Sequence, residues 1–262
     1  MDLNLTGKHA LVCGGSQGIG RAAAIALAAL GADVTVMARS EAGLVAAVAA
    51  LPRPHPAQRH THLVADVADS VDLGRKVEAI VGAHPVQILV NNTGGPAPGT
   101  AKDAAPAAYL DTFQRHLIAN QVLVQAVLAG MQAAGYGRIV NVISTSVKEP
   151  IVNLGVSNTI RGAVASWAKT LASELGPFGI TVNNVLPGYT RTQRLEQILK
   201  ERSAATGKPE AEIAQGMLAT VPAGRFAEAG EIAAAIAFLA SPAAGYINGV
   251  NLPVDGGRTR SL

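Results

Sequence analysis

A glycine-rich turn near the N-terminus is the first stretch whose residue types and spacing point to chemistry. Glycines stand at positions 14, 18 and 20, directly after the apolar run 9–13. Such a run predicts a buried strand, and the alanine-rich residues from 21 onwards predict a helix. A helix that begins at such a turn offers free backbone N–H groups and the positive end of its dipole to an anion. The turn therefore indicates a site for the diphosphate of a dinucleotide; the alternative is an ordinary glycine-rich connection.

Polar or glycine-containing residues also follow four later apolar runs. In a parallel sheet the carboxyl ends of the strands meet at one edge, where ligands bind. We therefore expect these residues to lie together, next to the glycine turn. They are Asp66-Val67, Asn91-Asn92-Thr93-Gly94, Ser144 and Pro187-Gly188.

Apolar runs and amphipathic or alanine-rich segments alternate along the whole chain. This alternation predicts an α/β fold in which helices cover both faces of a parallel sheet, a three-layered, doubly wound arrangement of the Rossmann type. With 262 residues, 49% of them hydrophobic, we expect a single domain with a sizeable core. The predicted strands are 9–13, 33–38, 61–65, 86–90, 138–143, 181–186 and 251–254.

The segment 189–226 interrupts this rhythm with a charged helical stretch at 193–202, a break at 207–209 and another short helix. An insertion after a strand end is typical of a lid over a site. The alternative is an arm that contacts a second copy of the chain.

Composition narrows the function class. The net charge of +3 comes without any run of Lys or Arg, which argues against a nucleic-acid partner. Cys13 is the only cysteine, so no intrachain disulfide forms, and a buried, inert thiol in a reducing compartment is expected. His55, His60 and His62 lack the further ligands that a metal site needs. With no signal peptide and no apolar stretch judged long enough to span a bilayer, we expect a cytoplasmic protein without membrane contact.

In this order, the motifs Gly14-x-x-x-Gly18-x-Gly20, Asp66-Val67, Asn91-Asn92-Thr93-Gly94, Ser144 and Pro187-Gly188 resemble those of the short-chain dehydrogenase/reductase family. The resemblance covers essentially the whole chain and is greatest to 3-oxoacyl-carrier-protein reductases. It implies a Rossmann-type fold, hydride transfer between a nicotinamide and a small-molecule substrate, and a homotetramer or dimer packed through long helices.

The resemblance also implies which residues hold the cofactor. The turn would hold the diphosphate, Asp66 and Val67 would flank the adenine, and the residues after 91 would lead to the inner ribose. The residues after 186 would hold the nicotinamide end. The implied cofactor residues are Gly14, Ser16, Gln17, Gly18, Ile19, Gly20, Asp66, Val67, Asn92, Thr93, Gly94, Arg161, Pro187, Gly188, Thr190 and Thr192.

The residue type at the end of the second predicted strand indicates which nicotinamide cofactor, NAD(H) or NADP(H), the chain binds. An acidic residue there would accept hydrogen bonds from the adenosine ribose and repel a 2′-phosphate. This chain has Arg39 instead, followed by Ser40. A guanidinium pairs with phosphate through two hydrogen bonds. We therefore predict NADP(H); the alternative is that Arg39 is only a solvated charge at a strand end.

The residues at the predicted catalytic positions depart from the family pattern of Asn, Ser, Tyr and Lys. Ser144 matches, but the tyrosine position holds Ser157, the lysine position holds Arg161, and the asparagine position falls on His116. A serine hydroxyl is a far weaker acid than a phenol, and arginine keeps its proton in proteins. Arg161 still has donors for ribose hydroxyls and for a developing oxyanion.

Three residues are candidates for moving the proton in place of the missing tyrosine. Lys148 lies four residues after Ser144, His116 titrates in the useful range, and Tyr189 follows the Pro-Gly pair. Lys148 could equally be a loop charge in solvent, and His116 a buried structural histidine. Asn120, one helical turn after His116, could replace the missing asparagine.

These observations leave two functions open. The first is an NADP(H)-dependent oxidoreductase that acts on a carbonyl or secondary alcohol with an altered acid–base set, on a substrate such as a 3-oxoacyl thioester or related ketone. The alternative is a non-catalytic NADP(H)-binding sensor or interaction protein on the same fold. In both cases no metal is expected.

Overall fold

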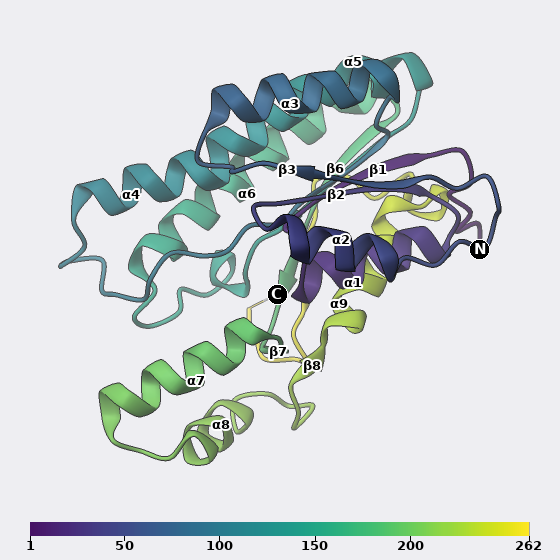
Figure 1. Cartoon of the computed structure of the whole chain (residues 1–262). Helices are drawn as coiled ribbons and strands as arrows, with labels where there is room; N and C mark the ends of the chain where they lie inside the picture. The colour runs from purple at the N-terminus through teal and green to yellow at the C-terminus, as the bar shows by residue number, and fades with distance from the viewer. Residues whose placement is uncertain (262) are drawn as a thin grey trace.

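Seven parallel strands form the centre of the computed structural model, which describes residues 1–261 (Figure 1). Their order in the sheet is β3-β2-β1-β4-β5-β6-β9, so the chain changes direction across the sheet between β1 and β4. This is the doubly wound arrangement predicted from the sequence. The strands are β1 (His9–Cys13), β2 (Asp33–Ala38), β3 (His60–Val64), β4 (Ile88–Asn91), β5 (Gly137–Val142), β6 (Ile180–Pro187) and β9 (Asn251–Val254).

Helices cover both faces of this sheet, as Figure 1 shows. One face carries α1 (Gly18–Ala29), α2 (Glu41–Ala49) and α9 (Ala229–Ala240); the other carries α3 (Ser70–Ala83), α5 (Ala119–Ala134) and α6 (Gly155–Leu175). Because side chains alternate along a strand, β1 contributes residues to the hydrophobic cores on both faces of the sheet. Ala10 and Val12 pack into the first core, and Leu11 and Cys13 into the second. Because strands such as β1 are buried on both faces, their sequences are continuously apolar rather than alternating.

The bounds of β1, β2 and β9 are those predicted, those of the other four strands differ by one or two residues, and one helix start was wrong. Helix α1 begins at Gly18 rather than at 21, and Gly20 is part of its first turn despite the poor helix propensity of glycine. The charged helix of the insertion is also longer than 193–202: α7 spans Gln193–Thr206.

A row of asparagines joins β4, β5, β6 and β9; Asn91, Asn141 and Asn184 are buried, and Asn251 is exposed. The amide of Asn91 donates to Asn141 (2.8 Å), that of Asn141 to Asn184 (2.9 Å), and that of Asn184 to Asn251 (2.8 Å). These residues are direct partners across β4, β5, β6 and β9. A shift in register would leave these buried amides unpaired, which costs free energy. The row therefore fixes the strand ends that carry the site.

One helical tract, Pro106–Ala134, is long and apolar enough by length and composition to cross a bilayer, contrary to the expectation from the sequence. It consists of α4 (Pro106–Phe113), a π-helical segment Gln114–Ile118, and α5. Leu123, Val127 and Met131 are fully buried in the second core. The tract is thus a layer of the domain, and a core helix passes the same test of length and composition.

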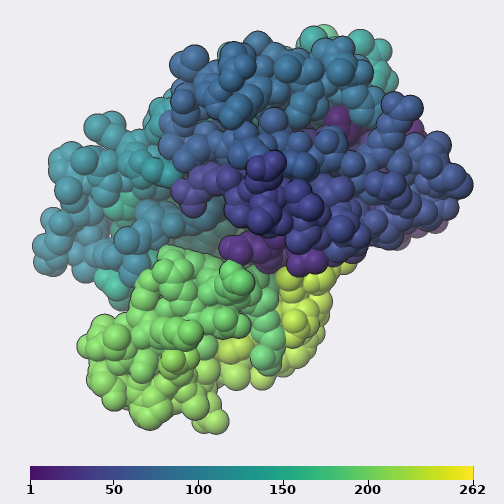
Figure 2. Space-filling model, viewed as in Figure 1, coloured from purple at the N-terminus to yellow at the C-terminus, as the bar shows by residue number. Residues whose placement is uncertain are grey.

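The segment after β6 forms a separate lobe. It holds β7 (Thr190–Arg191), α7, α8 (Glu210–Leu218) and β8 (Ala227–Glu228), where the two short strands pair in parallel at its base. Leu195, Met217 and Phe226 give the lobe its own apolar cluster. Figure 2 shows it, in green, projecting from the body of the molecule. Whether this lobe moves as a lid stays a prediction.

Candidate active site

The glycine turn joins β1 to α1 in a conformation that other residues do not reach easily. Gly14 and Gly18 have φ of 61° and 55°, in the left-handed region. A Cβ on Gly20 would collide with the carbonyl oxygen of Gly14. The N-cap residue Gln17 makes no side-chain cap, and the first turn of α1 has no acidic residue. The free N–H groups of this turn are therefore available to an anion.

Asn92 ties the end of β4 to this turn. Its side-chain amide donates to the backbone carbonyls of Cys13 (3.4 Å) and Gly14 (3.5 Å). The glycine turn and the Asn91-Asn92-Thr93-Gly94 motif are therefore in contact, although 78 residues separate Asn92 from Gly14 along the chain.

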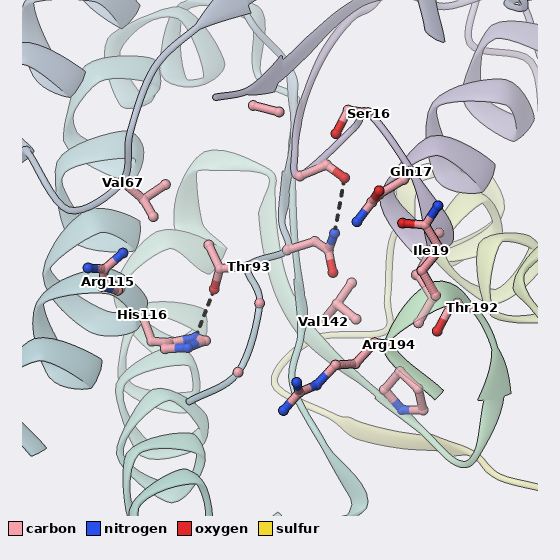
Figure 3. Close-up of a pocket in the computed structure, with 18 of the residues that line it drawn as sticks. Ser16, Gln17, Ile19, Val67, Thr93, Arg115, His116, Val142, Thr192 and Arg194 are labelled. Atoms are coloured by element: carbon pink, nitrogen blue, oxygen red, sulfur yellow. Dashed lines mark hydrogen bonds between the residues drawn. The ribbon is translucent and has the colours of Figure 1, made fainter. Parts of the chain in front are cut away.

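A cavity of about 1090 Å³ opens at the carboxyl edge of the sheet (Figure 3). Its size is near the upper end of the usual range for ligand pockets, about 300–1,000 Å³. Most residues predicted from the sequence line it. These are Gly14, Ser16, Gln17, Gly18, Ile19, Arg39, Asp66, Val67, Asn92, Thr93, Gly94, His116, Arg161, Pro187, Gly188, Tyr189, Thr190 and Thr192.

Other predicted residues are not among those that line the cavity. Gly20 packs against Gly14 beneath the turn, and Asn120 is buried on α5. Ser157 is buried on α6, with 8% of its surface exposed. Ser144 caps the short 3₁₀ helix Thr145–Val147, and its Oγ accepts from the backbone N–H of Ser146 at 3.1 Å. Lys148, the C-cap residue of the same 3₁₀ helix, does not line the cavity either. The roles of Ser144, Ser157 and Lys148 in catalysis, and of Gly20 in cofactor binding, stay predictions.

At one end of the cavity, Arg39 follows β2 on the surface and forms no ion pair within residues 1–261. Its neighbour Ser40 caps α2 by accepting from the N–H of Gly43 at 3.3 Å. The loop of Asp66 folds back on itself, since Asp66 Oδ1 accepts from the N–H of Ala68 at 3.0 Å. This end thus presents one unpaired guanidinium and a short acidic loop.

His116 and Arg161 lie together at the other end. A ring nitrogen of His116, Nδ1, is 2.8 Å from the hydroxyl of Thr93, as the dashed line in Figure 3 marks. Burial, and then the positive charge of Arg161, lower the pKa of His116 to about 3. The imidazole is therefore neutral at physiological pH.

Arg161 stays charged in this environment. Burial lowers its pKa to about 10, still well above neutrality. Its Nη1 donates to the backbone carbonyl of Val142 at 2.9 Å, which leaves most of its five N–H donors available. The arrangement offers a fixed positive charge, able to stabilise an oxyanion but not to give up a proton.

Comparison with known proteins places this site in a family. A family model described as Enoyl-(Acyl carrier protein) reductase matches residues 14–259. The chain belongs to the short-chain dehydrogenase/reductase family. It is 37% identical to the 3-oxoacyl-[acyl-carrier-protein] reductase FabG of Haemophilus influenzae, over 97% of this chain and 98% of that one.

Two further relatives match this chain over nearly the full length. The NADPH-dependent reductase BacG of Bacillus subtilis is 30% identical over 97% of this chain and 99% of that protein. The solved L-sorbose reductase of Gluconobacter frateurii, in complex with NADPH and L-sorbose, superposes with a TM-score of 0.92. It is 30% identical, and the match covers 100% of both chains.

The residues of this short-chain dehydrogenase/reductase fit a dinucleotide. The glycine turn gives an uncapped helix start at one wall of the cavity, and Gly94 lines the same cavity with nothing within 4 Å of an added Cβ. Pro187, Gly188 and Thr190 line it farther along the sheet edge. One cavity therefore includes both Arg39 and His116.

Among the residues at or near the site that escaped the sequence analysis, four carry polar side chains with a clear contact or charge. Arg115, Asp111 and Arg194 line the cavity. Asn158 does not, but its side chain donates to the carbonyl of Ile151 (2.9 Å) and accepts from its N–H (3.4 Å), which holds the loop before α6. Asp111 and Arg115 stand four apart on a helix, a spacing that sequence could have revealed. The position of Arg194 depends on tertiary structure.

Proposed function

We propose that this family member is an NADP(H)-dependent oxidoreductase that interconverts a carbonyl and a secondary alcohol. The observation that supports this most is the single cavity that runs from Arg39 and the glycine turn to Arg161 and His116. NADP(H) supplies or accepts the hydride when bound. Its reductase relatives, among them the NADPH complex of L-sorbose reductase, favour this cofactor.

Each part of the cavity has a binding task in this proposal. The α1 N-terminus holds the diphosphate, and Arg39 pairs with the 2′-phosphate. Thr93 and Gly94 line the path to the inner ribose, where the donors of Arg161 reach the hydroxyls. Thr190 and Thr192 hold the nicotinamide end.

The acid–base chemistry is divided between residues that replace the missing tyrosine. Ser144 and Arg161 stabilise the substrate oxygen while charge develops on it. Lys148, half-buried at the end of the 3₁₀ helix, supplies the proton in the reductive direction. The lowered pKa of His116 supports this choice, because an imidazole with a pKa of about 3 carries almost no transferable proton at neutral pH.

Assembly and location complete the proposal. We infer a homo-oligomer, a tetramer or dimer packed through the long helices, in the cytoplasm. Leu110, on α4, is 72% exposed, which supports a contact with a second copy. Sedimentation measures the oligomeric state directly.

The test is a screen of NADPH oxidation and NADP⁺ reduction against ketones, 3-oxoacyl thioesters and secondary alcohols, with NADH and NAD⁺ in parallel. Turnover with NADPH in preference to NADH is expected. The alternative, a non-catalytic sensor, predicts tight NADPH binding without turnover. Single-turnover mixing separates the two, because a sensor shows no hydride transfer even once.

A further inference from the structure

The charges that line the cavity do not balance. Four arginines, Arg39, Arg115, Arg161 and Arg194, face two aspartates, Asp66 and Asp111. Arg115 is neutralised within the cavity, since its Nε donates to both carboxylate oxygens of Asp111 at 2.8 and 2.9 Å. Arg39 lies at the far end, where the cofactor phosphate is proposed to bind. Two guanidinium groups remain for the substrate end.

Arg161 and Arg194 are those two groups, and both flank the same short segment. Arg194 Nη2 donates to the carbonyl of Pro96 at 3.3 Å, and a Cβ on the preceding Gly95 would lie 3.6 Å from Nη2 of Arg161. Within residues 1–261 neither guanidinium forms an ion pair. Each has carbonyl oxygen as its only hydrogen-bond acceptor in this part of the chain.

The position of Arg194 makes it the outer member of the pair. It stands in the first turn of α7, two residues after the cap Thr192, and its bond to Pro96 connects the lobe to the loop after β4. Figure 3 shows Arg194 reaching into the cavity from the side of Thr192, while Arg115 and His116 lie on the opposite side. A molecule that enters between the lobe and this loop passes the Arg194 guanidinium.

From this juxtaposition we infer that the substrate is a small oxo acid whose carboxylate pairs with Arg194, while its carbonyl lies near Arg161. This inference rests on the proposed function and names its substrate class. A guanidinium held by one long hydrogen bond releases it readily for the two short bonds of a carboxylate. The neutral imidazole of His116 adds no repulsion between the groups, and Arg161 provides a second positive charge behind the carbonyl.

The test compares acids with their neutral esters. NADPH oxidation is measured with 2-oxobutanoate, acetoacetate and 4-oxopentanoate, and with the methyl ester of each. We expect kcat/KM to be at least about tenfold higher for the preferred acid than for its ester, since hydrogen bonds between charged groups are the strong ones. The N-acetylcysteamine thioester of acetoacetate tests a neutral thioester in the same assay.

Variants assign the preference to one residue. Arg194→Met is expected to lower kcat/KM for the acid by about 10–100-fold, through KM, and to affect the ester far less, so that the preference for the acid is lost. Arg194→Lys restores part of the loss. The matched control is Arg202→Met, an exposed residue farther along α7 and not among those that line the cavity, which should change neither substrate.

A binding measurement keeps the inference testable without turnover. Calorimetry on the NADP⁺-saturated protein compares pentanoate with pentanamide; pentanoate should bind tighter, and only Arg194→Met should remove the difference. Equal use of acid and ester, or identical behaviour of Arg194→Met and Arg202→Met, overturns the inference while NADPH turnover leaves the proposed function intact. If no compound is reduced, the proposed function fails, and the pentanoate comparison alone decides whether the carboxylate site exists.

Discussion

The two ends of the cavity bind by different means. At the glycine turn the binding groups are backbone N–H groups, positioned by Gly14, Gly18 and a helix start that carries no side-chain cap. At the other end they are side chains from separate elements: His116 from the π-helical segment, Arg161 from α6 and Arg194 from the lobe.

Under the proposed function, this difference lets one fold keep its cofactor while its chemistry changes. Backbone groups are fixed by the turn conformation, so substitutions there disturb the turn itself. Side chains on rigid helices can be exchanged without moving the helix: Ser157 and Arg161, which we predict to replace the tyrosine and lysine of the family pattern, lie on α6, which runs unbroken through Gly155–Leu175. Substitutions at the glycine turn should therefore weaken cofactor binding, whereas substitutions at the side-chain end should mainly slow the reaction.

The largest effect is expected at the side-chain end. Arg161→Met removes the charge that stabilises the developing oxyanion, and kcat should fall by about 10²–10³-fold, the usual effect of losing one such donor. The dissociation constant for NADPH should rise less than about tenfold, since the glycine turn is untouched. Steady-state kinetics and NADPH fluorescence titration measure the two quantities.

The matched control for this variant is Lys169→Met, an exposed residue on the same helix, which should change neither value. An Arg161→Met protein with full kcat would show that the guanidinium takes no part in the reaction.

At the backbone end the opposite pattern is expected. Gly20→Ala places a Cβ against the Gly14 carbonyl and disturbs the turn. The dissociation constant for NADPH should rise by about 100-fold, equivalent to about 2.7 kcal/mol, and overpacking should lower the free energy of unfolding by about 1–3 kcal/mol. Calorimetry and urea unfolding check both numbers.

Gly82→Ala is the control for this substitution, because it lies on α3 with nothing within 4 Å of an added Cβ. That variant should bind NADPH normally and unfold with a slightly higher free energy, by up to about 1 kcal/mol. Normal binding by Gly20→Ala would mean that the turn does not hold the diphosphate.

Arg39 tests the choice between the two cofactors. Arg39→Asp exchanges attraction for repulsion at the 2′-phosphate, and the dissociation constant for NADPH should rise by about 10–100-fold. Binding of NADH, which lacks that phosphate, should stay the same or improve. Titration of both dinucleotides measures the ratio, with Arg53→Asp in an exposed loop as the control. An equal effect on both would refute the assignment of Arg39.

The smallest effect concerns pH and His116. Its folded pKa, about 3, lies below the unfolded value of 6.5, so above pH 6.5 both states are neutral and this residue adds no pH dependence. Below pH 6.5 the unfolded chain binds the proton first, and stability is lost as pH falls towards 3, at up to about 1.4 kcal/mol per pH unit.

Urea unfolding of wild type and His116→Gln between pH 7 and 4 tests this expectation. The difference between the two slopes isolates His116 from His9 and His60, whose pKa values burial also lowers. Parallel slopes would mean that the imidazole is protonated in the folded protein and is available as an acid after all.

The sequence predicted the cofactor end of the cavity better than the substrate end. The cofactor end was predictable because each motif directly follows its strand, and parallel pairing alone brings strand ends together. The predicted doubly wound parallel sheet agrees with the structure, and every predicted cofactor residue except Gly20 lines the cavity. That these residues bind the cofactor stays a prediction. Even there, the early start of α1 with Gly20 in its first turn was hidden, because glycine has a low helix propensity.

The substrate end could not be predicted in the same way. Arg194 meets Pro96 across 98 residues, and no local pattern encodes that approach. His116 reaches Thr93 from a π-helical segment, which shifts the register of the helix by one residue relative to a regular one. Burial and the positive charge of Arg161 lower the pKa of His116, and both depend on tertiary structure, so its neutral state was invisible from the sequence.

The most direct test of the central claim is hydride transfer in a single turnover. The protein, saturated with NADPH or with NADPH deuterated at C4 of the nicotinamide, is mixed rapidly with the best carbonyl substrate of the screen. We expect deuterium to slow the wild type, and Arg161→Met to react about 10²–10³-fold more slowly with NADPH still bound. A protein that binds NADPH but transfers no hydride, or one whose transfer rate is the same in Arg161→Met, would contradict this account.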